Sequence, residues 1–294
     1  MSFEYLTNKR MALDVLSGSL KDGGLIIFIG AGASKDMGLP SWFELVNALR
    51  KHQGLVELTG GKTATELHMA ADEVRDEVGD EMQFKKILQE VLYEFQLEDF
   101  VKKVYDYKLL ISLSALLMGS TRGRVTKVFT FNFDSMLQWY LSVFGFTLNV
   151  VSALPYKEKS VDVTIFHPHG YVPHPEISHQ FSREIILGLE EMDKRLGLGH
   201  PWFEVLKVNL RSNLAIFIGL SEDTFFDRAL SPVVSDVVNH VGGERPVGFW
   251  LFGGDKDEAV KKAMLRKNVI PITLDSYDEI PEYLLEICQK ASKM

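Results

Sequence analysis

The stretch Leu25-Ile-Ile-Phe-Ile-Gly-Ala-Gly-Ala-Ser34 decides the fold of this chain. Five apolar residues run directly into Gly30-Ala31-Gly32. A continuous apolar run that ends in glycines is typical of a buried strand in a parallel sheet. Glycine lets the backbone turn sharply and approach a ligand closely, and the free N–H groups of a following helix favour a phosphate. The stretch therefore predicts a nucleotide pyrophosphate site after the first strand, with a purely structural turn as the alternative.

This glycine loop differs from the common dinucleotide fingerprint, Gly-x-Gly-x-x-Gly. Lys35 stands where the third glycine belongs, and the segment after Pro40 has a helical pattern instead of a second strand. Ser41 is a plausible N-cap for that helix, because a serine side chain accepts a hydrogen bond from a backbone N–H of the first turn. The loop alone is therefore weak evidence for a nucleotide.

Strand and helix patterns alternate through most of the chain. Strand patterns occur at 25–29, 125–131, 214–219, 247–252 and 269–274, with 148–152 and 163–166 as short candidates. Helical patterns occur at 3–20, 134–144, 201–210, 223–240, 255–267 and 278–290. Such alternation is typical of a doubly wound sheet. The sequence predicts an α/β protein with a Rossmann-like parallel sheet of about six strands.

Residues 52–122 interrupt this alternation with an inserted all-helical layer. Helical spacing of apolar residues occurs at 65–78, 82–95 and 100–118, and no strand pattern separates them. We therefore expect two units: a Rossmann-like domain formed by 1–51 and 123–294, and an inserted helical subdomain at 52–122. The segment 170–200 is the least regular part of the chain.

The bulk composition excludes several classes of protein. The 294 residues are 46% hydrophobic and 24% charged, with a net charge of −8, so no basic field favours direct nucleic-acid binding. A single cysteine, Cys288, excludes an intramolecular disulfide and a Cys-x-x-Cys zinc site. The chain has no signal-peptide layout and no apolar run of roughly 20 residues. We expect a cytoplasmic protein without a membrane anchor.

Polar or glycine-rich groups follow four of the predicted strands. They are Gly30–Ser34, Asn132–Asp134, His167–Gly170 and Gly219–Ser221. In doubly wound sheets the ligand lies outside the carboxyl ends of the strands. We therefore expect these four groups to meet at one edge of the sheet.

These groups resemble, in order, the motifs of the sirtuin family. Gly30-Ala-Gly-Ala-Ser-Lys-Asp-Met-Gly-Leu-Pro-Ser-Trp42 is similar to its nucleotide-binding loop, and Thr130-Phe-Asn-Phe-Asp134 to its Thr-x-Asn-x-Asp motif. His169-Gly170 resembles its catalytic His-Gly pair, and Gly219-Leu-Ser221 its Gly-Thr-Ser turn. The resemblance covers roughly residues 23–51 and 124–276.

The resemblance implies an NAD site and a role for each matching residue. Asn132 would hydrogen-bond the nicotinamide ribose and a water, His169 would be the catalytic base, and Asp134 with the Phe133 N–H would read the carboxamide. Trp42 would lie over the nicotinamide ribose, and Gly219 and Ser221 would touch the ADP-ribose phosphates. The remaining cofactor-binding residues would be Gly30, Ala31, Gly32, Ala33, Ser34 and Pro40. A histidine with a pKa near its ordinary value of about 6.5 suits general-base work.

The chain also departs from classical sirtuins. Phe43 stands where those proteins have an arginine, and the chain cannot build their four-cysteine zinc module. What remains resembles the sirtuin-like NAD hydrolases of bacterial antiviral systems, whose toxic output is NAD depletion. The resemblance implies an NAD glycohydrolase without a metal and a HerA-type hexameric ATPase as partner. A homo-oligomer is expected because the helical layer is rich in Leu and Phe beyond what the sheet alone would cover. A non-catalytic nucleotide-binding scaffold is the alternative, and the missing cysteines disfavour a protein deacylase.

Each catalytic candidate also has a structural interpretation. Asn132 and Asp134 could cap the following helix. His169 could be a core histidine bonded to a carbonyl group. His167, His169, His174 and His179 could bind a metal, although their spacing matches no usual zinc pattern.

Overall fold

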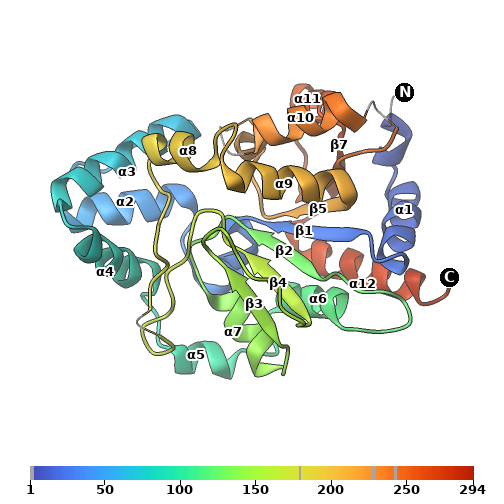
Figure 1. The fold of residues 1–294 in the computed structure, drawn as a ribbon, viewed down its shortest axis with the longest axis horizontal. Coiled ribbons are helices and arrows are strands. Elements are labelled where there is room, and N and C mark those ends of the chain that lie inside the picture. Colours follow the sequence, from blue (N-terminus) through green and yellow to red (C-terminus); the bar gives the residue numbers. More distant parts are fainter. Residues whose placement is uncertain (1–2, 179, 227–229, 242–243) are drawn as a thin grey trace.

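A parallel sheet forms the centre of the computed structural model, which describes residues 3–178, 180–226, 230–241 and 244–294. Within these residues the sheet has seven strands, all parallel to their neighbours, in the order β3-β4-β2-β1-β5-β6-β7 (Figure 1). The strands are β1 (Leu25–Ile29), β2 (Lys127–Thr130), β3 (Leu148–Val151), β4 (Val163–Phe166), β5 (Leu214–Ile218), β6 (Gly248–Gly253) and β7 (Val269–Leu274). The Rossmann-like α/β prediction is confirmed, with one strand more than the approximate number expected.

Strand β1 lies at the point where the strand order reverses. It pairs with β2 on one side and with β5 on the other, with Ile29 opposite both Thr130 and Ile218. All five of its side chains are buried. Leu25, Ile27 and Ile29 belong to the hydrophobic cluster on one face of the sheet, and Ile26 and Phe28 to the cluster on the other. Burial on both faces explains why the strand is apolar throughout.

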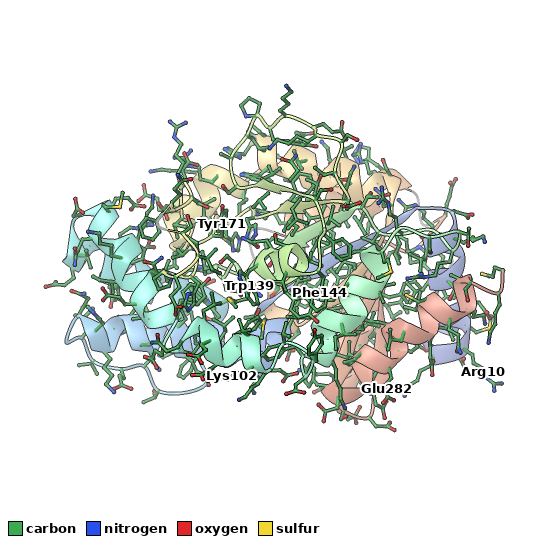
Figure 2. All side chains as sticks on the ribbon, turned by 90° about the horizontal axis from the view of Figure 1, so that it is seen from below. Arg10, Lys102, Trp139, Phe144, Tyr171 and Glu282 are labelled. Atoms are coloured by element: carbon green, nitrogen blue, oxygen red, sulfur yellow. The ribbon has the colours of Figure 1, made fainter. Side chains whose placement is uncertain are left out.

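Helices cover both faces of the sheet (Figure 1). On one face lie α9 (Pro201–Ser212), α10 (Ser231–Val241) and α11 (Glu258–Arg266), which lie above the sheet in Figure 1. On the opposite face lie α1 (Lys9–Lys21), α6 (Lys108–Leu117), α7 (Met136–Val143) and α12 (Ile280–Ala291). Figure 2 views the molecule from this second side, with α12 marked by Glu282 and α7 by Trp139.

A second group of helices lies beyond one end of the sheet, at the left of Figure 1. It consists of α2 (Trp42–His52), α3 (Ala64–Val78), α4 (Glu81–Leu92) and α8 (Leu189–Leu196), with α5 (Leu97–Lys102) below them. The predicted cap at Ser41 is confirmed as a capping box with Glu44, and Thr63 forms the same motif with Glu66 at the start of α3. Local sequence therefore fixes where α2 and α3 begin.

Several predicted helices have different limits in the structure. The helix expected at 100–118 is wrong as a single element, because the chain turns at 103–107 between α5 and α6. The turn is stabilised by the Phe100 ring, which stacks on Tyr107 with centroids 4.5 Å apart and contacts Trp139 at 4.9 Å. No glycine or proline marks this turn, so the sequence pattern did not indicate it.

The other differences are smaller. The first predicted helix divides into a 3₁₀ turn, Glu4–Thr7, and α1. The irregular segment 170–200 contains α8, and α7 begins at Met136 instead of residue 134. The helix expected at 223–240 appears as a 3₁₀ turn, Glu222–Phe225, followed by α10, while 227–229 lie outside the described residues. A last 3₁₀ turn, Tyr277–Glu279, precedes α12.

The range 52–122 does not occupy one place in the fold. Helices α3 and α4 pack against α2 beyond the sheet, whereas α6 packs against α12 and α7 in the layer that covers the sheet. The division into a Rossmann-like domain and an inserted subdomain stays a prediction. Within the part of the chain that the structure describes, no helix is long and apolar enough to cross a membrane.

Candidate functional site

The loops after β1 and β5 pack backbone against backbone at the strand reversal. The Gly30 N–H donates to the Ile218 carbonyl at 2.9 Å, and the Gly32 N–H donates to the Gly219 carbonyl at 3.0 Å. A Cβ atom on Gly30 would lie 2.5 Å from the Gly219 oxygen, and one on Gly219 would lie 2.3 Å from the Ala33 nitrogen. Gly219 also has a φ of +67°, a value that glycine adopts readily. These glycines are therefore required for the contact between the two loops.

These contacts between the loops occupy backbone N–H groups that the sequence predicts as donors to a phosphate. The N–H groups of Gly30, Gly32 and Ala33 all donate to carbonyl groups of the protein. The segment after β1 is a 3₁₀ helix, Ala31–Met37, and not the start of an α-helix. In this conformation these three N–H groups are not available to a ligand.

Three polar side chains form a buried network beside the glycine loop. The Asn132 Nδ2 donates to the Ser34 Oγ at 2.9 Å, and the Ser34 hydroxyl donates to the Asp134 Oδ2 at 3.0 Å. All three residues are buried. The network joins a strand-end loop to a motif about a hundred residues later, as predicted from the positions of these residues after neighbouring strands.

The network borders a cavity of about 10 Å³, which is also lined by Ile29, Thr130 and Met37. Such a volume is close to the minimum that a single water molecule needs. Small-molecule sites are usually clefts of roughly 300–1,000 Å³. The site is therefore closed around its polar side chains in this conformation.

Asp134 combines a structural contact with an unusual electrostatic position. Its Oδ1 accepts from the Met136 N–H at 3.0 Å, so this side chain does hold the first turn of α7. The side chain of Asn132 instead turns to Ser34, so the capping interpretation applies to Asp134 alone. Burial raises the pKa of the Asp134 carboxyl, while hydrogen bonds from Met136 N–H, Ser34 and Asn132 act in the opposite direction.

His169 lies between aromatic rings from the Asn132 motif. Its ring centroid is 5.1 Å from that of Phe131 and 6.0 Å from that of Phe133. The side chain is 9% exposed, and its Nε2 has no hydrogen-bond partner among the described residues. Burial lowers the pKa of His169 to about 3, assisted by the nearby His68 and opposed by a hydrogen bond with the Phe131 carbonyl. In this closed conformation the pKa of His169 therefore lies well below the value that suits general-base work.

His167 has a different environment only two residues earlier. Its Nε2 is 3.1 Å from the Gln138 Oε1, its Nδ1 is 3.4 Å from the Asn132 carbonyl oxygen, and its ring packs on Tyr171, which is labelled in Figure 2. Burial also lowers the pKa of His167 to about 3. Both ring nitrogens of His167 lie near polar partners, as in a core histidine. The same interpretation stays open for His169, because its ring is buried and bonded to the Phe131 carbonyl group.

The metal interpretation gains no support from the arrangement. Among the described residues, no group of three or more His, Cys, Asp or Glu side chains is placed to hold a metal ion. His174 is buried, with its Nε2 3.2 Å from the Phe95 carbonyl oxygen. His179 lies outside the described residues.

Trp42 extends the row of rings from His169 towards α3. Its ring lies 6.1 Å from that of Phe133 and 5.2 Å from that of His68. The Trp42 Nε1 is buried and, within the described residues, has no hydrogen-bond partner. Two ring nitrogens without partners therefore flank Phe133, one from His169 and one from Trp42.

The remaining predicted residues lie towards the rim of this region. Ala31 and Pro40 are half-buried, whereas Gly32 and Ser221 are exposed. The Ser221 Oγ lies 3.2 Å from the Thr224 Oγ1. The motif residues thus divide into a buried set around Asn132, Asp134 and Ser34 and a more exposed set.

An open groove lies on the other side of Met37. Its volume is about 460 Å³, and its lining includes Asp36, Gly38, Phe95, Phe100, Lys103 and Tyr107. Met37 lines both this groove and the small cavity. The small cavity and a space of ligand size therefore share the buried residue Met37 in their linings.

Sequence reasoning missed the residues that hold the site from outside. Tyr93 bonds the backbone of Ser135 and Val172, and Gln138 bonds His167. A signal was present in α4, where Lys85 and Gln89 are polar but fall on the buried face of an otherwise amphipathic helix. Polar residues at such positions need partners, which indicates contacts with another segment.

Fold and site together define a Rossmann-like α/β protein with a closed polar cluster at the reversal of its strand order. No protein-family model matches the chain, and no curated protein is significantly similar to it. What the molecule does is therefore inferred from its residues and their geometry.

Proposed function

We propose that this protein is an NAD glycohydrolase, which converts NAD and water into nicotinamide and ADP-ribose. One observation carries the proposal. The His169 Nε2 is buried without a partner among the described residues, next to the motif that holds Asn132 and Asp134. A buried polar atom without a hydrogen bond is costly, at about 1–3 kcal/mol, and a catalytic role is one of the explanations for such an atom in a native protein.

The network gives Asn132 a defined orientation. Its amide nitrogen donates to Ser34, whose hydroxyl donates to Asp134. The amide oxygen is then the atom of this side chain that is able to accept a hydrogen bond from a water molecule. In the reaction, the bond between C1 of the ribose and the nicotinamide nitrogen breaks, and its electron pair leaves with nicotinamide. The oriented water then attacks C1.

His169 is the proposed acceptor of the proton that this water loses. A positioned general base typically contributes 10²–10⁴-fold to a rate, and works best with a pKa near the operating pH. The low pKa in the closed conformation has burial as its first cause. Opening the site to admit substrate and water reduces that burial, and so brings the pKa of His169 back towards about 6.5.

The site must also open for NAD to enter, because the cavity beside Asn132 has a volume of about 10 Å³. Met37 lines both this cavity and the groove of about 460 Å³. We propose that the nicotinamide end of NAD reaches Asn132 when Met37 moves aside. The Phe133 N–H and Asp134 would then contact the carboxamide.

The alternative is a nucleotide-binding scaffold without catalysis, and it needs the same opening of the cavity as the proposed enzyme. The engaged N–H groups of Gly30, Gly32 and Ala33 would have to be released for either function. Against the scaffold, a pure binding protein has no need for an imidazole whose Nε2 lacks a partner among the described residues beside an oriented amide. Cleavage of NAD by the assembled protein distinguishes the two.

The biological setting is proposed on the sirtuin-like motifs alone. On this basis the protein is an antiphage defence effector in the cytoplasm, and it acts by NAD depletion. The protein would work as a homo-oligomer with a HerA-type hexameric ATPase, without direct binding to nucleic acid. A partner that opens the closed conformation would make NAD cleavage depend on assembly of the complex.

The decisive experiment incubates the purified protein with NAD, alone and with the partner ATPase, and measures nicotinamide and ADP-ribose by chromatography. Asn132→Ala and His169→Ala should each lose about 10²–10⁴-fold of the turnover. His169→Ala should still bind NAD. His240→Ala, at an exposed position on α10, serves as the matched control and should keep full turnover.

Two outcomes would contradict the proposal. If His169→Ala cleaves NAD at the rate of the unaltered protein in an active assembly, His169 is not the base. If the unaltered protein binds NAD but yields no nicotinamide under any condition, the scaffold alternative is correct.

A further inference from the structure

Helix α4 holds the loop that follows His169 through a row of polar side chains. Lys85 Nζ donates to the carbonyl groups of Ser182 and Arg183 at 3.1 and 2.8 Å, and Gln89 Nε2 donates to the Pro173 carbonyl at 2.7 Å. Tyr93, the C-cap residue directly after α4, continues the row. Lys85, Gln89 and Tyr93 are all buried.

Helix α3 holds the end of the same loop. The His68 Nδ1 lies 2.6 Å from the Leu187 carbonyl oxygen, Arg75 donates to the Ile185 carbonyl at 2.9 Å, and Asp72 accepts from the Leu189 N–H at 2.9 Å. This part of the loop is bonded in turn to the His169 segment, because the Ile186 N–H donates to the His169 carbonyl at 2.8 Å. The two helices are therefore connected to the His169 segment through hydrogen bonds with this one loop.

Tyr93 has a more direct connection than the other residues of the row. Its hydroxyl donates to the Val172 carbonyl at 2.7 Å and accepts from the Ser135 N–H at 2.8 Å. The Val172 N–H donates to the Phe133 carbonyl at 2.7 Å. One phenol thus closes a ring of hydrogen bonds between the segment after His169 and the segment that begins with Asn132.

The Tyr93 hydroxyl is buried inside the protein. Its ring packs on His174 with centroids 4.9 Å apart. Burial raises the pKa of Tyr93, and the charge of Asp134 acts in the same direction. The hydroxyl is therefore neutral and able to donate and accept at the same time, as the ring of hydrogen bonds requires.

We propose that Tyr93 is a positioning residue, which sets the distance between the Asn132 and His169 segments and so makes the helical layer a control element of the site. The proposal rests on the proposed function for its catalytic readout. Removal of the hydroxyl leaves the buried Val172 carbonyl and Ser135 N–H without this partner, and it opens the ring of hydrogen bonds. A displacement of about 1 Å between reacting groups can cost about 10²-fold in rate.

The test compares Tyr93→Phe with Tyr283→Phe. Tyr283 is the matched control because it is also buried and donates its hydroxyl to one backbone carbonyl, that of Lys9 at 3.1 Å, between α12 and α1. Each variant is assayed for NAD cleavage in the activated full-length assembly. Tyr93→Phe should lose about 10²-fold in kcat with little change in KM, whereas Tyr283→Phe should keep both.

A second measurement does not depend on catalysis. Hydrogen exchange by mass spectrometry follows the peptides that cover 132–136 and 169–174. In Tyr93→Phe the Ser135 and Val172 amides should exchange at least about tenfold faster. The Ser135 N–H loses its acceptor, the Tyr93 hydroxyl, and the Val172 N–H loses the fixed position of its partner segment. Tyr283→Phe should leave both peptides unchanged.

The outcomes separate this inference from the proposed function. If the unaltered protein does not cleave NAD, the proposed function fails, and the exchange result alone decides whether Tyr93 couples the two segments. Unchanged exchange in Tyr93→Phe overturns the inference. An equal loss of kcat in both variants also overturns it, because the effect would then be one of general stability.

Discussion

The strand-end loops and the helices α3 and α4 are attached to the rest of the molecule by opposite means. At the loops, backbone meets backbone, and the contact of Gly30 and Gly32 with Gly219 depends on the absence of side chains. At the helices, long polar side chains such as Lys85 and Gln89 reach the carbonyl groups of a distant loop. The first contact tolerates no added atom, whereas the second depends on particular atoms being present.

The largest expected effect comes from adding one methyl group to the loop contact. Gly219→Ala combines an unfavourable φ with a clash, because its Cβ would lie 2.3 Å from the Ala33 nitrogen. Gly38→Ala is the control, since Gly38 has a φ of +80° but no described atom within 4 Å of its Cβ position. We expect losses in the free energy of unfolding of about 2–5 kcal/mol for Gly219→Ala and about 1 kcal/mol for Gly38→Ala.

Urea denaturation followed by circular dichroism measures both values. Equal losses in the two variants would show that backbone conformation alone, and not the contact between the loops, explains the glycine at residue 219.

A smaller effect is expected at the helical attachment. Lys85→Met keeps an unbranched apolar stem but removes the donor to the Ser182 and Arg183 carbonyls. The expected loss is about 1–3 kcal/mol, the usual cost of leaving buried groups without partners. Lys86→Met is the control, because the neighbouring Lys86 is exposed and surface changes usually stay within about 0.5 kcal/mol.

The same denaturation experiment reports on Lys85→Met, and hydrogen exchange of residues 170–187 shows whether the loop is released. If Lys86→Met loses as much stability as Lys85→Met, the two carbonyl contacts contribute nothing specific.

This contrast also explains what the sequence could predict. Leu25–Ile29 and Leu214–Ile218 are apolar runs that end in glycine, so local pattern alone identified them as buried strands, and the doubly wound order brought their ends together. Ser34, Asn132 and Asp134 follow strands that are neighbours in such a sheet, so their meeting was also foreseeable.

The attachment of the helices was not foreseeable. Lys85 reaches residues about a hundred positions later in the chain, and Tyr93 joins two segments that lie far apart in sequence. No periodicity encodes such partners. The closed cavity and the low pKa of His169 depend on how tightly these distant segments pack, and the turn between α5 and α6 depends on ring stacking of Phe100 on Tyr107.

The last expected effect concerns acid stability and is shared by the two buried histidines. His167 and His169 each have a pKa of about 3 in the folded protein and about 6.5 when unfolded. Between these values the unfolded chain binds more protons, so the free energy of unfolding falls as the pH falls from about 6.5 to about 3. Each histidine contributes at most about 1.4 kcal/mol per pH unit across this range, and nothing above it.

His167→Gln and His169→Gln should each make the free energy of unfolding less dependent on pH between 4.5 and 6.5, as measured by urea denaturation. Under the proposed function, only His169→Gln should also abolish NAD cleavage. An unaltered pH dependence in both variants would mean that these side chains are not buried as neutral imidazoles.

The cavity of about 10 Å³ beside Asn132 has a consequence for any measurement of affinity. A dinucleotide can occupy this site only in molecules that have already opened, so the observed dissociation constant equals the intrinsic one divided by the open fraction. If one molecule in a hundred is open, binding is weakened about 100-fold although every contact in the open form is intact. A partner that merely holds the molecule open would then tighten binding by the same factor, without touching the ligand.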